Sequence, residues 1–164
     1  MDYLLHILVL ATIFTILAAS LDLLAGQSGF LSIAHAGFYG LGAYTSALLA
    51  VHIGIPFFVG VFAGMAIAAL ISFVVSLPSL RLHDDYFVIA TFGFQMILFS
   101  IFNNWMELTR GPLGIPGIPQ PVIFGWHVNS HAEFLILASG LAAIAYLVVH
   151  RIASSPFGRV PSSA

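Results

Sequence analysis

The most constraining feature of this sequence is a run of 58 residues, Leu23 to Leu80, that contains no Asp, Glu, Lys or Arg. Three shorter runs also lack these residues: Tyr3–Leu21, Tyr86–Met106 and Phe134–His150. A charged side chain at the centre of a bilayer costs about 2.5–3.5 kcal/mol on insertion scales. A helix that crosses the hydrocarbon needs about 20 mostly apolar residues. Each short run therefore predicts one membrane-spanning helix, and the long run predicts two.

The composition excludes several classes of protein. Only 6% of the 164 residues are charged, 60% are hydrophobic, and the mean hydropathy is +1.08. So few charged side chains cannot supply the polar exterior of a water-soluble domain. Four Arg, no Lys and a net charge of -2 exclude a nucleic-acid-binding protein. The absence of Cys excludes disulfides and thiolate chemistry. An integral membrane protein remains.

The predicted fold class is all-α, a polytopic membrane helical bundle of about five transmembrane helices. The spacing of the charges predicts spans at about 4–25, 31–53, 57–78, 86–106 and 133–150. A tight turn is expected at Gly26–Gly29, and Ile53-Gly54-Ile55-Pro56 separates the second span from the third. Asp84 and Asp85 precede the fourth span, where anions are favoured at a helix N-terminus.

The arginines predict the orientation of the chain. Five spans place its two ends on opposite sides of the membrane. With the N-terminus outside, Arg81, Arg151 and Arg159 face the cytoplasm and only Arg110 faces out, which satisfies the positive-inside rule. No basic residue precedes the first apolar stretch, so we expect that stretch to be a retained span and not a cleaved signal peptide.

The second span carries more polar atoms than lipid contact requires. Small residues recur in it at helical spacing: Ser32, Ala36, Gly40, Ala43 and Ala47. This pattern is typical of tight helix packing. Ser32, His35 and Tyr44 add polar atoms, so a helix lining a polar path is the alternative interpretation. For His35, a structural hydrogen bond and a role in transport both remain open.

Two further patterns predict local structure. Gly60 and Gly64 form a GxxxG pair that predicts close contact with another helix. Residues 111–125 contain four Gly and four Pro, which excludes a regular helix there. A long ordered loop is usually functional or packed against something, so we expect a docking surface or cap on the outer face.

No catalytic residue and no metal site is predicted. His127, His131 and Glu133 suggest a metal site by their spacing, but the HExxH motif is absent and the first His follows a Gly/Pro-rich stretch. An intramembrane hydrolase is a second hypothesis. The seven His are scattered, however, and no nucleophile, base and orienting acid occur at a characteristic spacing. The sequence therefore favours a chain that is not an enzyme.

Four segments together resemble one family, in the same order and with similar spacing. They are Gly26–Leu49, Ser79–Ile97, Leu108–Pro119 and Ser154–Arg159. The resemblance is to the LivM-type permease subunit of bacterial branched-chain amino acid ABC importers, with its related urea and amide permeases. It covers nearly the whole chain up to Arg159.

The resemblance implies that residues 1–164 form the N-terminal part of the transmembrane domain of an ATP-driven importer in the cytoplasmic (inner) membrane. The implied partners are a second, LivH-type permease subunit, two cytoplasmic ATP-binding subunits and a periplasmic binding protein that delivers Leu, Ile or Val. ATP binding and hydrolysis in the partners switch the permease pair between outward-open and inward-open states. No Walker A motif occurs in this chain, and no cofactor and no nucleic acid is expected.

Two groups of residues become candidates for function. For the translocation path they are Ser32, His35, Gly40 and Tyr44. For the start of the loop that couples to the ATPase they are Ser155, Pro156, Phe157, Gly158 and Arg159.

The sequence departs from the family pattern in places. Val160–Ala164 does not match, and family members continue further, so we expect a fragment, a C-terminally truncated gene product or a sequence whose reading frame was lost. Asp22 stands where relatives often have Asn, and His83-Asp84 where they often have Arg-Gly. The alternatives left open are a permease for urea, short amides or other neutral amino acids, and a truncated permease that does not transport.

Overall fold

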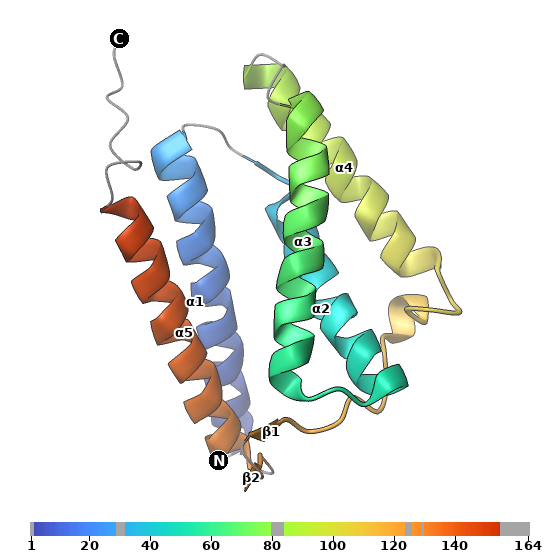
Figure 1. Cartoon of the computed structure of the whole chain (residues 1–164), viewed down its shortest axis with the longest axis vertical. Coiled ribbons are helices and arrows are strands. Elements are labelled where there is room, and N and C mark those ends of the chain that lie inside the picture. Colours follow the sequence, from blue (N-terminus) through green and yellow to red (C-terminus); the bar gives the residue numbers. More distant parts are fainter. Residues whose placement is uncertain (1, 29–31, 80–83, 124–125, 129, 155–164) are drawn as a thin grey trace. The chain divides into compact units, whose positions relative to one another are not determined.

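The regular structure of this chain is almost entirely helical. The computed structural model describes residues 2–28, 32–79, 84–123, 126–128 and 130–154. Its elements are α1 (Asp2–Ser28), α2 (His35–Ile53), α3 (Phe57–Ser79), α4 (Asp84–Asn104), the 3-10 helix η1 (Gly111–Leu113), β1 (Val122–Ile123), β2 (Trp126–His127) and α5 (His131–Ala153) (Figure 1). Within the described residues, the five α-helices are all long and apolar enough to cross a membrane. The predicted all-α fold with five spans is therefore confirmed.

Two of the predicted boundaries are wrong by several residues. Helix α1 continues through Ser28, so the expected turn at Gly26–Gly29 does not begin at Gly26. The second span was expected from residue 31, but α2 begins at His35, with Ala34 as its N-cap residue. The cause of the later start is tertiary. The chain just before α2 bonds to α4 through Ile33 and does not extend its own helix.

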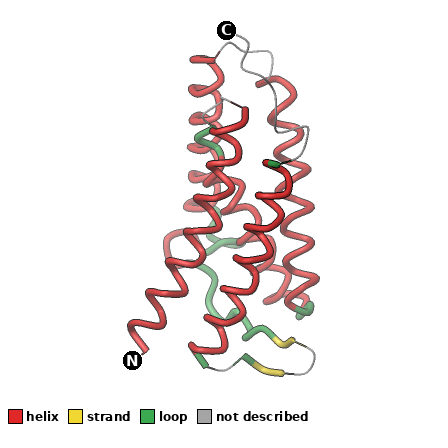
Figure 2. Tube along the Cα trace, turned by 90° about the vertical axis from the view of Figure 1, so that its left-hand side faces the viewer, coloured by secondary structure: helices red, strands yellow, loops and turns green. Residues whose placement is uncertain are grey.

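The chain divides into two compact units, Met1–Leu31 with Val128–Ala164 and Ser32–His127. In the first unit α1 packs along α5, and the two helices run in the same direction (Figure 1). In the second unit α2 packs on both α3 and α4. Besides these helices, the described residues contain η1 and the antiparallel pair of two-residue strands β1 and β2 (Figure 2).

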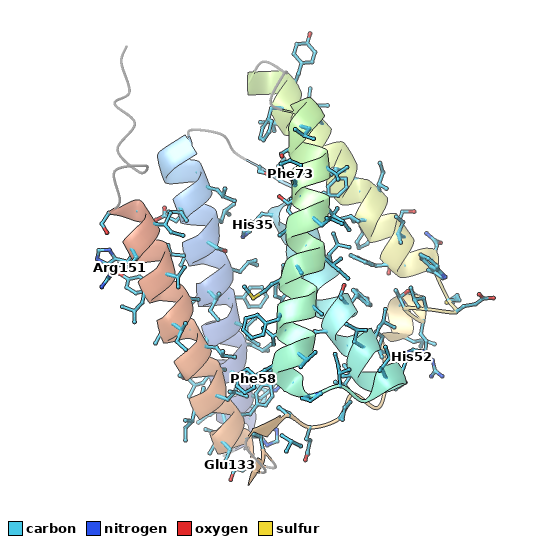
Figure 3. The ribbon with its side chains drawn as sticks, in the orientation of Figure 1. His35, His52, Phe58, Phe73, Glu133 and Arg151 are labelled. Atoms are coloured by element: carbon cyan, nitrogen blue, oxygen red, sulfur yellow. The ribbon has the colours of Figure 1, made fainter. Side chains whose placement is uncertain are left out.

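Apolar side chains cover the outside of these helices. Tyr3, Phe62 and Ile136, on three different helices, are 76%, 67% and 73% exposed, and side chains project all along the ribbons (Figure 3). Among the described residues only ten are buried, and four of them are glycines: Val9, Ala34, Gly37, Gly60, Gly64, Thr91, Leu98, Thr109, Gly111 and Ala138. A helix that is hydrophobic on every face belongs in a membrane or in the interior of a larger assembly. Because so few residues are buried, a small number of close helix–helix contacts hold the helices together.

One of these contacts joins the backbones of α2 and α3. A Cβ atom added to Gly64 would lie 2.7 Å from the carbonyl oxygen of Gly42, and one added to Gly60 would lie 3.6 Å from the Ser46 Cβ. Small residues let two helix backbones approach, so dispersion contacts and weak hydrogen bonds form along them. The helix contact predicted from Gly60 and Gly64 is confirmed, and it is made within this chain.

The Gly/Pro-rich connection after α4 begins with an ordered cap. The Thr109 hydroxyl lies 2.6 Å from the Phe102 carbonyl oxygen and 2.8 Å from that of Trp105, and it accepts the Gly111 N–H at 3.3 Å. Thr109 is only 2% exposed. These bonds satisfy carbonyl groups that the end of a helix leaves without intrahelical partners. As predicted, the described residues 111–123 form no regular α-helix, although η1 gives the segment one tight turn.

Helix α5 begins with a capping box. The Ser130 hydroxyl accepts the Ala132 N–H at 3.2 Å, and the Glu133 carboxylate accepts the Ser130 N–H at 3.2 Å. Both bonds satisfy donors that the start of a helix leaves unpaired. Glu133 therefore has a structural role at the first turn of the helix.

Candidate functional site

The candidate site lies where α2 meets α4. The Ile33 N–H donates to the Thr91 hydroxyl at 3.3 Å. Further along, two ring pairs join the helices: Phe38 with Phe94, and Tyr44 with Phe102. Residue numbers rise together on both sides, so α2 and α4 run in the same direction. We call this contact the α2–α4 seam. Its residues are Ile33, Gly37, Phe38, Gly40 and Tyr44 on one side and Thr91, Phe94, Gln95, Leu98 and Phe102 on the other.

Helix α2 begins well inside the length of its neighbours. Thr91, which binds the chain just before α2, stands seven residues into α4, about 10 Å from the start of that helix at 1.5 Å per residue. On the other side, α3 runs 15 residues beyond Gly64, whereas α2 begins only seven residues before Gly42, which faces it. Helix α3 therefore continues about 12 Å past the start of α2. The first turn of α2 lies within the depth of the other two helices.

The segment that leads into α2 is non-helical backbone at that same depth. Ala34 is 1% exposed, and this N-cap residue makes no side-chain hydrogen bond to the start of α2. Backbone that is not helical survives inside a membrane only where protein or a water-filled cavity surrounds it. Thr91 contributes to this environment. It is 3% exposed, it donates to the Val88 carbonyl oxygen at 3.0 Å, and it accepts from Ile33.

The structure brings two of the four predicted path residues together. A Cβ atom on Gly40 would lie 3.0 Å from Phe102 Cε2, and the Tyr44 ring stacks on the same ring with centroids 4.5 Å apart. His35 is the first residue of α2. Ser32 precedes the helix, so its predicted place on the small-residue face of a helix is wrong. The coupling residues, Ser155 to Arg159, lie outside the described part of the chain.

The sequence prediction missed Gln95, which lies in the middle of the seam. A Cβ atom on Gly37 would lie 2.7 Å from Gln95 Oε1 and 2.7 Å from Leu98 Cδ1, so only glycine leaves room for both side chains. Gln95 Oε1 is buried and has no hydrogen-bond partner among the described residues. A buried acceptor left without a partner costs about 1–3 kcal/mol. Its sequence position could have identified Gln95 as a candidate site residue, because it is at the midpoint of the apolar stretch Tyr86–Asn104.

A second feature is a hollow at the opposite end of α2. It has a volume of about 710 Å³ and lies between the end of α2, the start of α3 and residues 117–122. Gly54, which ends α2 with φ +69°, and Pro56 line it from the short connection, and Gln120 lines it from the Gly/Pro-rich segment. The long connection thus packs at this end of the α2–α3 pair.

The metal hypothesis gains no support from the geometry. Within the described ranges, no three His, Asp or Glu side chains come close enough together to hold a metal ion. Glu133 serves the capping box, and its neighbour His131 starts α5.

Comparisons with known proteins agree with this architecture. A model of the family described as branched-chain amino acid transport system / permease component matches residues 3–161. The high-affinity branched-chain amino acid transport system permease protein LivM of Escherichia coli (strain K12) is 39% identical over 124 residues, 76% of this chain. The protein of the same name from Salmonella typhimurium (strain LT2) is 40% identical over 113 residues, 69% of this chain.

The chain is much shorter than these relatives. The matched region makes up 29% of the Escherichia coli protein and 27% of the Salmonella typhimurium protein. No solved structure shows significant similarity to it. The family match nevertheless covers nearly every residue, and it includes all five long helices. This chain therefore belongs to the family of permease components of branched-chain amino acid transport systems.

Proposed function

We propose that this chain is part of the membrane permease of an ATP-driven importer that carries Leu, Ile and Val across the cytoplasmic membrane. The observation that carries the proposal is the family match over residues 3–161, in a chain whose five long helices are each apolar enough to span a bilayer. The two relatives that match it are named as permease proteins of high-affinity branched-chain amino acid transport. In this proposal residues 1–164 supply the N-terminal part of the transmembrane domain.

The start of α2 is the proposed polar element of the translocation path. An amino acid crosses as a zwitterion with an aliphatic side chain, so the path must offer both polar and apolar contacts. The N-terminal end of a helix favours a carboxylate, and α2 begins at His35 within the depth of α3 and α4. Beyond it, Gly40 and Tyr44 contact the Phe102 ring. Ser32, His35, Gly40 and Tyr44 remain the proposed path residues.

The energy for transport is proposed to come from other chains. The sequence contains no Walker A motif, so this permease hydrolyses no ATP in our proposal. Two ATP-binding subunits in the cytoplasm supply that step, and a LivH-type permease completes the membrane channel. Ser155, Pro156, Phe157, Gly158 and Arg159 begin the proposed contact with an ATP-binding subunit.

The proposed orientation places the N-terminus outside. Arg151 then lies on the cytoplasmic side and Arg110 on the outer side, in agreement with the positive-inside rule. The hollow formed by α2, α3 and residues 117–122 then opens on the outer side. That is the side from which a periplasmic amino-acid-binding protein delivers its cargo.

Co-purification followed by uptake tests this function. The chain is purified from native membranes in a mild detergent, and its intact mass and associated proteins are identified. We expect an ATP-binding protein and a second permease to accompany it, and unlabelled Ile and Val to compete with uptake of radiolabelled Leu. Competition by urea or short amides would instead assign the related substrate class. A chain of 17.5 kDa with no ATP-binding partner would identify a permease fragment that does not transport.

A further inference from the structure

We propose that the Gln95 side-chain carbonyl is the acceptor for the α-ammonium group of the amino acid in transit. This inference rests on the proposed function and adds a contact from α4 to those expected from α2. It is carried by the position of Gln95 in the membrane, by the missing partner of its oxygen and by the groups around it.

The first argument is depth. The apolar stretch of α4 runs from Tyr86 to Asn104, so Gln95 stands nine residues from either end, about 13 Å along the helix. A polar side chain at the centre of a span is far from interfacial water, and such residues commonly mark a substrate pathway. In secondary transporters, substrate sites lie near the bilayer midplane.

The second argument is the missing partner. Gln95 Oε1 is withdrawn from solvent, and no group in the described part of the chain donates a hydrogen bond to it. Two other polar side chains on α4 form hydrogen bonds within their own helix. Thr91 donates to the Val88 carbonyl oxygen, and Asn104 donates to the Ser100 carbonyl oxygen. Gln95 Oε1 is therefore an acceptor without a partner in the described part of the chain.

The third argument is the surroundings. Gln95 Oε1 lies against Gly37, in the first turn of α2, where the proposed function places the substrate carboxylate. The Phe38 and Phe94 rings, with centroids 5.5 Å apart, flank the same level of the seam and are apolar. One place thus combines an acceptor for an ammonium, a helix end for a carboxylate and aromatic surface for an aliphatic chain. Contact with the substrate requires α2 and α4 to separate at Gly37, because the oxygen is covered in this structure.

Uptake by the complete importer tests the proposal. Radiolabelled leucine uptake is measured in cells that express the chain with its transport partners, for wild type, Gln95→Met and Gln95→Glu. Met has a similar length but lacks the amide oxygen, and its thioether sulfur is only a weak acceptor. We therefore expect the uptake rate to fall at least about tenfold. Glu keeps an acceptor oxygen, so we expect it to retain more uptake than Met.

Stability measurements separate a transport role from a packing role. Removal of an unpaired acceptor should leave the thermal midpoint of the purified protein unchanged or raise it. A loss of uptake with an undiminished midpoint supports the proposal. A parallel loss of uptake and stability, or wild-type uptake in Gln95→Met at equal membrane abundance, overturns it.

The matched control is Asn104→Leu, which removes an exposed amide from the same helix and should leave uptake unchanged. A comparable loss of uptake in this variant would overturn the assignment of Gln95, since removal of any amide from α4 would then suffice. Wild-type membranes that import no branched-chain amino acid would refute the proposed function itself, and the role of Gln95 with it.

Discussion

Gly64 on α3 lies directly against the backbone of Gly42 on α2, so closely that a methyl group at position 64 would sit 2.7 Å from the Gly42 carbonyl oxygen. Both partners are backbone, and neither can rotate away as a flexible side chain would. This contact sets how closely α2 and α3 approach each other.

Gly64→Ala is therefore expected to destabilise the protein. The added methyl group forces the two helices apart, and overpacking of this kind costs about 1–3 kcal/mol. The thermal midpoint in detergent should fall. Gly93→Ala is the matched control, because a methyl group on Gly93 meets nothing within 4 Å and alanine favours the helix by about 0.5–1 kcal/mol. Equal midpoints for the two variants would contradict the close contact.

Thr109→Val is expected to loosen the cap that follows α4. Valine keeps the shape of threonine but cannot bond the Phe102 and Trp105 carbonyl oxygens or accept the Gly111 N–H. The buried polar groups left behind cost about 1–3 kcal/mol. The measurement is the rate of trypsin cleavage after Arg110, which should rise. Thr12→Val removes a hydroxyl that bonds only within α1 and should leave this rate unchanged; a slow rate in both variants would show that the cap does not depend on Thr109.

His35→Leu and Tyr44→Ala are expected to reduce uptake of branched-chain amino acids by about tenfold without lowering membrane abundance. The first change removes a polar group from the start of α2, and the second removes the ring that stacks on Phe102. Tyr44→Phe keeps the stacked ring and separates its role from that of the hydroxyl. Radiolabelled uptake and an immunoblot of the membranes give the two quantities. Normal uptake in both His35→Leu and Tyr44→Ala would remove these residues from the path.

The orientation can be tested with introduced cysteines, since the sequence contains none. Leu113 in η1 is 84% exposed and is predicted to face out, and Ser154, just after α5, is predicted to face the cytoplasm. A membrane-impermeant maleimide should label Leu113→Cys in intact cells and Ser154→Cys only after the membrane is opened. The reverse pattern would place the N-terminus in the cytoplasm.

The sequence alone determined the number and approximate position of the membrane spans. Charged residues are costly at mid-bilayer, so Arg81 and Glu107 mark the ends of spans even without a structure. Asp22 lies inside α1, six residues before its end. The family resemblance was also readable from sequence, since it depends on local motifs. The Gly60 and Gly64 pair predicted a helix contact, because close backbone approach needs small residues at that spacing.

Only the tertiary structure decided where α2 begins and what Gln95 does there. Helix geometry allowed Ser32 to continue α2, and the hydrogen bond from Ile33 to Thr91, 58 residues away, competes with that extension. Hydropathy treats Gln95 as one tolerable polar residue in an apolar stretch. Only the structure shows that Gly37 packs against the Gln95 oxygen and that this oxygen is buried without a hydrogen-bond partner among the described residues. Hydropathy and charge act locally and can be read along the chain, whereas the pairing of one helix with another depends on contacts between residues distant in sequence.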